Sequence, residues 1–304
     1  MRQFRGYLMV AGAALFWGVS ATAAKALLAQ GLDTVLLVQT RATFAAAAMA
    51  GYLALARPAL LRVRREDLWR LALLGTVGVA GSNITYYFTI REGSVAIAIL
   101  LQYTAPLLVM AYAAWRKEEQ LTPGKVMAAL IAIGGCYLAV GGATGIEGGV
   151  SPAGLVSGIL SAFTFGFMTV YTRHMLARYS VWTVTCYALI AASLFWLVVN
   201  PPWNIPSHSP GPSLWMILAG FAVVSVLIPH TLFFGGLRHV VASRAIIVST
   251  LEPVIAIVSA ALFVGELLQA PQIGGAVLVI GAIVLLNIRR EPGGEELQEG
   301  VDAA

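Results

Sequence analysis

The chain has 304 residues, of which 59% are hydrophobic and 11% are charged, and its formal net charge is +5 at pH 7. A soluble domain carries about 25% charged residues, and the mean hydropathy of +0.83 leaves no room for one of any size. Cys136 and Cys186 both lie in apolar segments, so they predict neither a disulfide framework nor a metal site. A multi-pass membrane protein without metal or cofactor is expected. The basic residues are scattered between apolar spans, so nucleic acid is not an expected partner.

Ten apolar segments are long enough to cross a bilayer, which takes about 20 helical residues for a hydrocarbon core of about 30 Å. In chain order they are expected at 7–29, 34–56, 68–90, 94–115, 124–142, 152–173, 181–199, 214–236, 244–264 and 271–288. The first segment follows two arginines and imitates a secretory signal, but its length and the nine later spans favour an uncleaved helix. No long period-two alternation occurs, so the fold class expected is an all-α integral membrane protein.

Lysine and arginine in the loops predict the orientation, because basic loops stay on the cytoplasmic side. With both termini cytoplasmic, 16 of the 19 basic residues fall in inner loops or tails, and only Arg91 falls in an outer loop. Lys25 and Arg41 lie inside spans. We therefore expect both termini in the cytoplasm.

An internal repeat relates the two halves of the chain. The segment from Leu101 to Pro106 matches the segment from Val248 to Pro253 at an offset of 147 residues. The same offset carries Glu119 onto Glu266 and Gly134 onto Gly281, and Trp17-Gly18 falls on Phe165-Gly166 at an offset of 148. Each half has five spans, an odd number, so the second half must enter the membrane from the opposite side. We expect two inverted five-helix repeats, at 1–143 and 151–290, and a disordered acidic cytoplasmic tail at 291–304.

Several stretches resemble the EamA domain of the drug/metabolite transporter superfamily. They are Ala14-Leu15-Phe16-Trp17-Gly18, Arg41, Pro106 with Glu119-Gln120-Leu121-Thr122 and Gly134, and Leu251-Glu252-Pro253-Val254 with Gly265-Glu266, Gly274-Gly275 and Gly281. The resemblance covers nearly the whole chain as two tandem copies. It implies ten helices, cytoplasmic termini, a bacterial inner-membrane location and transport of small metabolites, often export; some members of the family export amino acids. The first copy departs by carrying Ala105 where the second has Glu252.

Pro106 and Pro253 are expected to interrupt their helices. Each lacks an N–H, so the carbonyl groups of Gln102 and Ser249 lose their helical donors. In hydrocarbon a freed carbonyl must find a partner or line a wet cavity. Because the interruption occurs twice at matching positions, we interpret it as part of a substrate cavity, with Gln102, Tyr103 and Ser249 beside it. A kink satisfied by a neighbouring helix is the alternative.

Charged and titratable residues inside spans are the next candidates, because they are costly there unless paired or wet. Glu252 is predicted to pair with Arg41, or to couple transport to protons. Lys25 either snorkels to the interface or forms one of two gate charges with Arg173, its repeat equivalent. His230 could relay protons, although a structural hydrogen bond near the inner mouth is the commoner role for such a residue.

Aromatic side chains predict the wall of the cavity. Asn83, Tyr86 and Tyr87 share one face of the third span. Together with Trp17, Tyr103 and Phe165 they would suit a flat, amphipathic or cationic solute; ordinary packing is the alternative.

The function expected is a secondary transporter that exports amino acids or similar amphipathic solutes by alternating access around a central cavity, with protons as a candidate coupling ion. A channel-like permease and a multidrug efflux carrier are the alternatives. The sequence has no Walker motif, His-rich metal cluster or Gly-x-Ser-x-Gly turn, so an enzyme is not expected.

Overall fold

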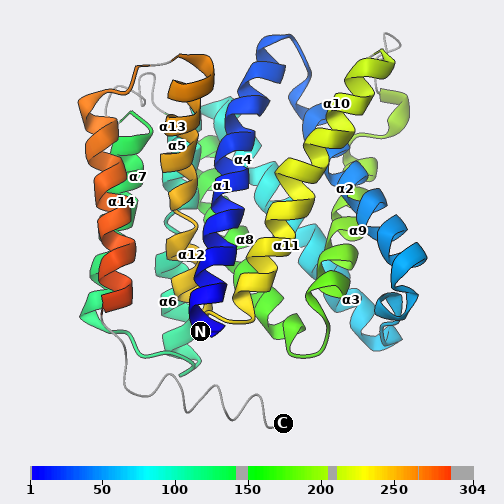
Figure 1. The fold of residues 1–304 in the computed structure, drawn as a ribbon, viewed down its shortest axis with the longest axis horizontal. Helices are drawn as coiled ribbons and strands as arrows, with labels where there is room; N and C mark the ends of the chain where they lie inside the picture. Colours follow the sequence, from blue (N-terminus) through cyan, green and yellow to red (C-terminus); the bar gives the residue numbers. More distant parts are fainter. Residues whose placement is uncertain (1, 142–149, 205–210, 266, 289–304) are drawn as a thin grey trace.

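The computed structural model describes residues 2–141, 150–204, 211–265 and 267–288, and the ten expected spans are present as helices (Figure 1). Glu266 and the tail at 291–304 lie outside the described residues. The spans of the first half are α1 (Arg2–Ala29), α2 (Thr34–Ala56), α3 (Arg65–Leu73) with η2 (Leu74–Ala80) and α4 (Gly81–Glu92), α5 (Val95–Gln102) with α6 (Ala105–Trp115), and α7 (Pro123–Ala139). Those of the second half are α8 (Pro152–Leu176), α9 (Val181–Val199), α10 (Pro212–Ala222) with η5 (Val223–Leu227) and α11 (Ile228–Leu237), α12 (Ala242–Val248) with α13 (Leu251–Val264), and α14 (Ala270–Ile288).

Six of these helical stretches are long and apolar enough to cross a membrane by length and composition alone, and α7 and α14 are shorter apolar helices. The other two spans, α2 and α3–η2–α4, carry polar residues such as Arg41 and Asn83 within their apolar sequence. Two short 3₁₀ turns, η1 (Pro58–Leu61) and η4 (Pro202–Asn204), lie in the connections.

The repeat is visible in the irregular parts of the helices as well as in their order. η2 and η5 are both π-helical segments, and they interrupt the third span of each half. The fourth span of each half is broken, at Tyr103-Thr104 and at Ser249-Thr250, directly before the helix that carries the proline. Both prolines therefore lie in the first turn of a half-helix, where a missing N–H costs little. The starts of matching helices keep one offset: α3 begins at 65 and α10 at 212, and α7 begins at 123 and α14 at 270.

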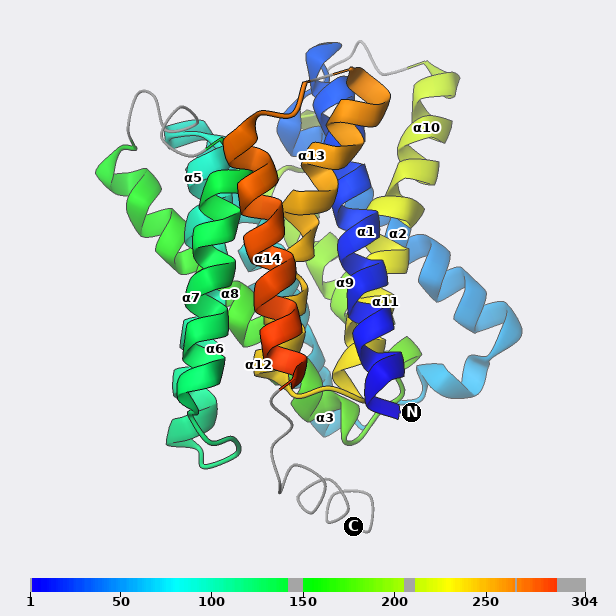
Figure 2. The same ribbon diagram turned by 60° about the vertical axis from the view of Figure 1, so that its left-hand side comes forward.

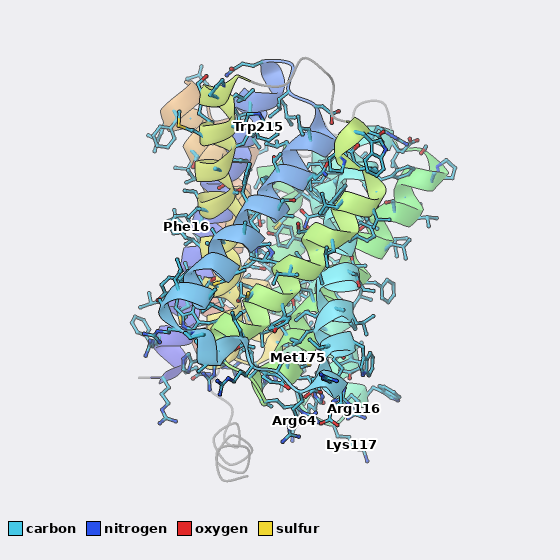
Figure 3. The ribbon with its side chains drawn as sticks, turned by 90° about the vertical axis from the view of Figure 1, so that its right-hand side faces the viewer. Phe16, Arg64, Arg116, Lys117, Met175 and Trp215 are labelled. Atoms are coloured by element: carbon cyan, nitrogen blue, oxygen red, sulfur yellow. The ribbon has the colours of Figure 1, made fainter. Side chains whose placement is uncertain are left out.

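The two halves run through the bundle in opposite senses. We call the end of the bundle at which α1 begins the N-terminal face (Figures 1 and 2); α14 ends at this face too. The α5–α6 span runs toward it, whereas its repeat equivalent α12–α13 runs away from it. Arg64, Arg116 and Lys117 gather at the N-terminal face, and Trp215 at the start of α10 lies toward the opposite face (Figure 3). The expected pair of inverted five-helix repeats is confirmed.

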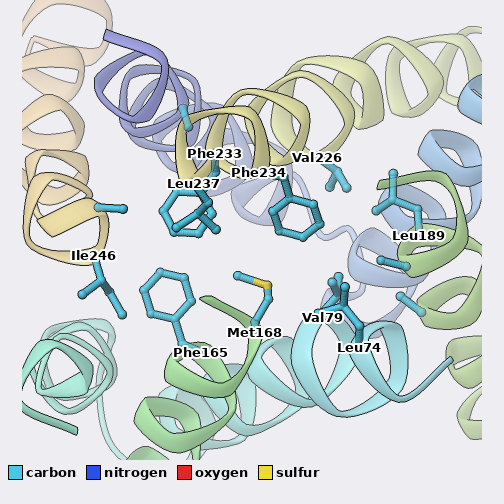
Figure 4. Close-up of a cluster of buried hydrophobic side chains, with 14 of the residues drawn as sticks. Leu74, Val79, Phe165, Met168, Leu189, Val226, Phe233, Phe234, Leu237 and Ile246 are labelled. Atoms are coloured by element: carbon cyan, nitrogen blue, oxygen red, sulfur yellow. The ribbon is translucent and has the colours of Figure 1, made fainter. Parts of the chain in front are cut away.

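The contacts between helices follow the repeat as well. α1 packs on α11 and α13, and its equivalent α8 packs on α4, α5 and α6. α2 pairs with α9, and α7 pairs with α14, so these two pairs each join a helix to its own equivalent. Between them lies one hydrophobic core in which Phe165 and Met168 of α8 face Phe233 and Phe234 of α11 (Figure 4). The core thus holds the two repeats together at the centre of the bundle.

The α7–α14 pair depends on glycine. A Cβ atom placed on Gly275 would lie 2.5 Å from the carbonyl oxygen of Gly135 and 2.4 Å from the backbone nitrogen of Ala139. Neither backbone atom can move without shifting its helix. Gly274, one residue earlier, has no neighbouring atom within 4 Å. Small residues at one face therefore allow the two helix backbones to touch, as is common in membranes.

We expect Gly275→Ala to destabilise the protein, because over-packing of a close contact typically costs about 1–3 kcal/mol. Thermal unfolding of the purified protein in detergent measures the effect, and Gly274→Ala is the matched control, expected to leave the melting temperature unchanged or slightly raised. Equal melting temperatures for the two variants would contradict the close contact.

Candidate functional site

The two helix breaks bring Tyr103 and Glu252 together at the centre of the bundle. The Tyr103 hydroxyl donates to Glu252 Oε2 at 2.8 Å and also lies 3.1 Å from the carbonyl oxygen of Ser249. Pro253 cannot donate to that carbonyl, which instead accepts the backbone N–H of Glu252 at 3.0 Å as well as the Tyr103 hydroxyl. Glu252 lies in the first turn of α13, where the helix dipole favours a negative charge.

This arrangement accommodates Glu252 in either protonation state. A hydroxyl has one proton to donate and can accept as well. When Glu252 is ionised, Tyr103 donates to the carboxylate. When Glu252 is protonated, the carboxyl group can donate to Tyr103, which then donates to the carbonyl of Ser249. The contact crosses the repeats, because Tyr103 belongs to the first half and Glu252 to the second.

Arg41 does not form the expected ion pair with Glu252. Its Nε donates to Ser225 Oγ at 3.0 Å, Nη1 donates to the Tyr87 hydroxyl at 3.1 Å, and Nη2 donates to the carbonyl oxygen of Ser225 at 3.3 Å. The guanidinium also lies over the Phe221 ring, 5.4 Å from its centroid. Ser225 belongs to the π segment η5, and this irregular turn supplies the neutral acceptors that Arg41 uses in place of the carboxylate.

Asn83 and His230 are equivalent residues of the two repeats and make equivalent hydrogen bonds. Asn83 Nδ2 donates to the carbonyl oxygen of Val79 at 2.6 Å, and His230 Nδ1 lies 2.9 Å from that of Val226. Both carbonyls belong to the π segments. The His230 ring is buried, and it meets Trp17 edge to face with centroids 5.5 Å apart. His230 therefore lies at the depth of Trp17, midway along α1, and not at the inner mouth.

The predicted aromatic residues form two groups. Tyr103, Phe165 and Trp17 are linked through Phe233, which stacks on Phe165 at 6.1 Å and lies 5.4 Å from Trp17. Tyr86 and Tyr87 form a separate edge-to-face pair at 5.6 Å, connected to Arg41 through the Tyr87 hydroxyl.

Three other predicted residues lie at the edges of this arrangement. Gln102 is half-buried at the end of α5, directly before the helix break. Lys25 is exposed near the end of α1, as expected for a snorkelling side chain. Arg173 lies near the end of α8 and is half-buried. Because the two helices end at opposite faces, Lys25 and Arg173 do not meet.

A match to a family model covers residues 4–141 and again 152–288, and its description is the EamA-like transporter family. The chain belongs to this family. Membership of this transporter family makes the chain a membrane transporter and not an enzyme.

Several curated relatives span most of this EamA-like transporter. An "uncharacterized inner membrane transporter" of Salmonella typhimurium, YicL, is 24% identical over 93% of this chain and 95% of its own. A "probable terminal-alkyne amino-acid exporter" of Streptantibioticus cattleyicolor is 28% identical over 82% of each chain. The "threonine/homoserine exporter RhtA" of Salmonella typhimurium is 26% identical over 78% of this chain and 77% of its own. A crystal structure shares the fold with a TM-score of 0.77 at 22% identity, over 93% of this chain and 96% of the other.

Sequence reasoning missed three residues of this centre. Phe233 and Phe234 are the repeat equivalents of Tyr86 and Tyr87, so the offset of 147 applied to the aromatic face of the third span would have found them. Ser225 falls opposite Gly78 at that offset and left no such signal. In the described part of the EamA-like transporter, no group of three His, Cys, Asp or Glu residues is placed to hold a metal ion.

A surface pocket of about 450 Å³ lies over the connection between α6 and α7. Its lining residues are Ala114, Lys117, Glu118, Glu119, Gln120 and Leu121. None of the central residues described above lines this pocket, so it is separate from them.

We expect Tyr103→Phe to lower the stability of the transporter by roughly 1–3 kcal/mol, because the Glu252 carboxylate then loses its hydroxyl donor inside the bundle. The melting temperature in detergent measures the loss. Tyr112→Phe is the control, because the Tyr112 side chain is exposed on α6. A Tyr103→Phe protein as stable as the control would show that the hydroxyl contributes nothing to the native state.

Proposed function

We propose that this transporter exports amino acids or similar amphipathic zwitterions across a bacterial inner membrane, by alternating access around a central cavity. The observation that carries the proposal is Arg41, a guanidinium inside a span. In the described part of the chain, no carboxylate lies within ion-pair distance of it.

The hydrogen bonds of Arg41 favour an anionic ligand. A guanidinium has five N–H donors, and three bonds go to neutral acceptors on Ser225 and Tyr87. No carboxylate of the described residues contacts this positive charge, and a charge without a close counter-ion is costly within a membrane. A substrate carboxylate would supply the missing charge, and the planar fork of arginine matches a carboxylate with two parallel hydrogen bonds.

Glu252 is suited to bind the ammonium group of a zwitterion or to take up a proton. It interacts with Arg41 at longer range, without contact. The half-buried state of Arg41, Glu252, Trp17 and Tyr86 in the middle of the bundle supports an accessible space between them. Aromatic rings in that space would stack on an apolar or cationic part of the solute. We propose Glu252 as the proton-coupling carboxylate, with Tyr103 holding it in either state.

The relatives and the loop charges support the remaining parts of the proposal. Two of the relatives are named as amino-acid exporters, and a third is named as an inner membrane transporter. The basic residues concentrate in the loops of the N-terminal face, which by the positive-inside rule belongs in the cytoplasm together with both termini.

Counterflow in proteoliposomes tests the proposed activity, with radiolabelled threonine and phenylalanine as probes. We expect saturable uptake into vesicles preloaded with the same amino acid. Linear, unsaturable flux would indicate a channel-like permease. Thermal stabilisation by cationic drugs and not by amino acids would indicate a multidrug carrier, because a ligand stabilises the form that it binds.

Arg41→Lys keeps the charge but removes the fork. We expect the KM for amino acid to rise roughly ten- to a hundredfold, because charge-assisted hydrogen bonds are worth about 1.5–3 kcal/mol. Arg91→Lys is the matched control, since Arg91 is an exposed residue paired with Glu92. An unchanged KM in Arg41→Lys would remove Arg41 from the substrate site.

Glu252→Gln tests proton coupling with an isosteric neutral side chain. The variant should retain counterflow exchange but lose the accumulation that an imposed pH gradient drives in the wild-type protein. Glu118→Gln, on the exposed α6–α7 connection, should behave like wild type. If the pH gradient still drives accumulation in Glu252→Gln, another group carries the proton.

A further inference from the structure

Two clusters of polar side chains join the repeats at the N-terminal face. In the first, Asp67 of α3 accepts hydrogen bonds from Tyr179 Oη at 2.7 Å and Arg178 Nη1 at 3.2 Å, both in the α8–α9 connection. Arg70 also donates to Asp67, at 2.5 Å. We call these four residues the Asp67 latch. Asp67 is only 1% exposed although it is an acid near the end of the bundle.

The second cluster, the Glu119 latch, joins the α6–α7 connection to α12. Glu119 accepts a hydrogen bond from Ser243 of the second repeat, and Lys125 Nζ lies 3.4 Å from the same carboxylate oxygen. The side chains of Glu119 and Lys125 are 9% and 6% exposed. The next residue of α12, Arg244, donates to the Tyr7 hydroxyl of α1 at 3.2 Å.

Both latches must break if the repeats separate at this face. Separation takes the second-repeat donors away from two buried carboxylates, and removing a partner from a buried, hydrogen-bonded charge is destabilising. Buried, charge-assisted hydrogen bonds are also the strong ones, about twice as strong as neutral bonds. Burial and the hydrogen bond to Asp67 raise the pKa of Tyr179 above its ordinary value, so the hydroxyl remains a donor at physiological pH.

The opposite face does not repeat these residues. The repeats meet there through the neutral amide pair of Gln39 and Asn200, at 2.6 and 2.8 Å, and through Ser151, which donates to the half-buried Glu92 at 3.0 Å. At the offset of 147, the counterparts of Asp67, Arg178 and Tyr179 are Leu214, Gly31 and Leu32. Those of Lys125 and Ser243 are Gln272 and Ala96, and only Glu119 has an acidic counterpart, Glu266. An inverted repeat with identical halves would close equally well at either face. Here the side chains that close the N-terminal face have lost their equivalents on the other.

We propose that these two latches bias the carrier toward the state that is closed at the N-terminal face and open at the opposite face. The bias rests on alternating access, which belongs to the proposed function. It concerns only the resting equilibrium between the two states and needs no substrate. The empty protein would then already favour one of the two states, and a solute would have to shift the equilibrium away from that state.

Accessibility of a central cysteine tests the bias. Cys136→Ala and Cys186→Ala remove the native thiols, and Gln102→Cys places a reporter at the helix break. A membrane-impermeant maleimide is added to either side of oriented vesicles, without substrate. We expect labelling of the parent protein from the opposite face. In Asp67→Asn with Glu119→Gln, labelling from the N-terminal face should rise roughly tenfold.

A second variant tests one contact between the repeats by itself. Ser243→Ala removes only the hydrogen bond that Glu119 receives from the second repeat and leaves the buried Lys125–Glu119 pair in place, so labelling from the N-terminal face should rise by less than in the double variant. Glu66→Gln is the control, because the Glu66–Arg64 pair is exposed and lies in the first repeat alone. Melting temperatures identify any variant that fails to fold, and the second variant then decides.

Unchanged labelling in folded latch variants, or labelling of the parent from the N-terminal face, would overturn the bias. If amino-acid counterflow failed but the labelling pattern were as predicted, the proposed substrate would be contradicted and the proposed role of the latches would be supported.

Discussion

The constraint on which this molecule depends is that backbone polar groups in lipid have no water to bind. Irregular backbone is therefore confined to places where the protein itself supplies the missing partner. The described parts of the spans have four such places, two π segments and two helix breaks, and each side-chain partner described above comes from the bundle interior. Asn83 and His230 bond carbonyls of the π segments, and Tyr103 bonds the carbonyl of Ser249 at the second helix break, which also accepts the N–H of Glu252. The need to satisfy the backbone thus gathers polar side chains at the centre of an otherwise apolar bundle.

The irregular backbone features recur in both repeats, whereas the central charged residues do not. The π segments, the breaks and the prolines all recur in the second repeat, which provides two related arrangements of one bundle. The central charges do not recur: the equivalents of Arg41 and Glu252 are Ala188 and Ala105. A fully symmetric chain would offer a solute two equal half-sites. This chain offers one cation and one acid, which suits a solute with two unlike ends.

Much of the architecture can be predicted from the sequence, because it follows from the lengths and the number of the apolar segments. Twenty-residue apolar runs define the spans, and an odd number of spans per repeat forces the inversion. The partners of the charged residues cannot be predicted in this way. Arg41 and Glu252 were expected to meet because their depths permit it, but depth says nothing about which helices are neighbours. The π segment that turns Ser225 toward Arg41 shifts the helical register by one residue, and no local propensity in the sequence marks where that shift occurs.

The central contacts also explain how binding and movement can be linked. Arg41 belongs to the first repeat but bonds Ser225 of the second, and Glu252 of the second repeat bonds Tyr103 of the first. Any motion that separates the repeats strains both bonds at once. A solute that contacts Arg41 and Glu252 together adds a further bridge between the same two bodies, so its binding energy changes when they move. A ligand shifts a conformational equilibrium only by its differential affinity for the two states. Side chains that bridge the repeats are the ones whose contacts differ between those states, so the proposed function assigns the coupling to these two contacts, one at a π segment and one at a helix break.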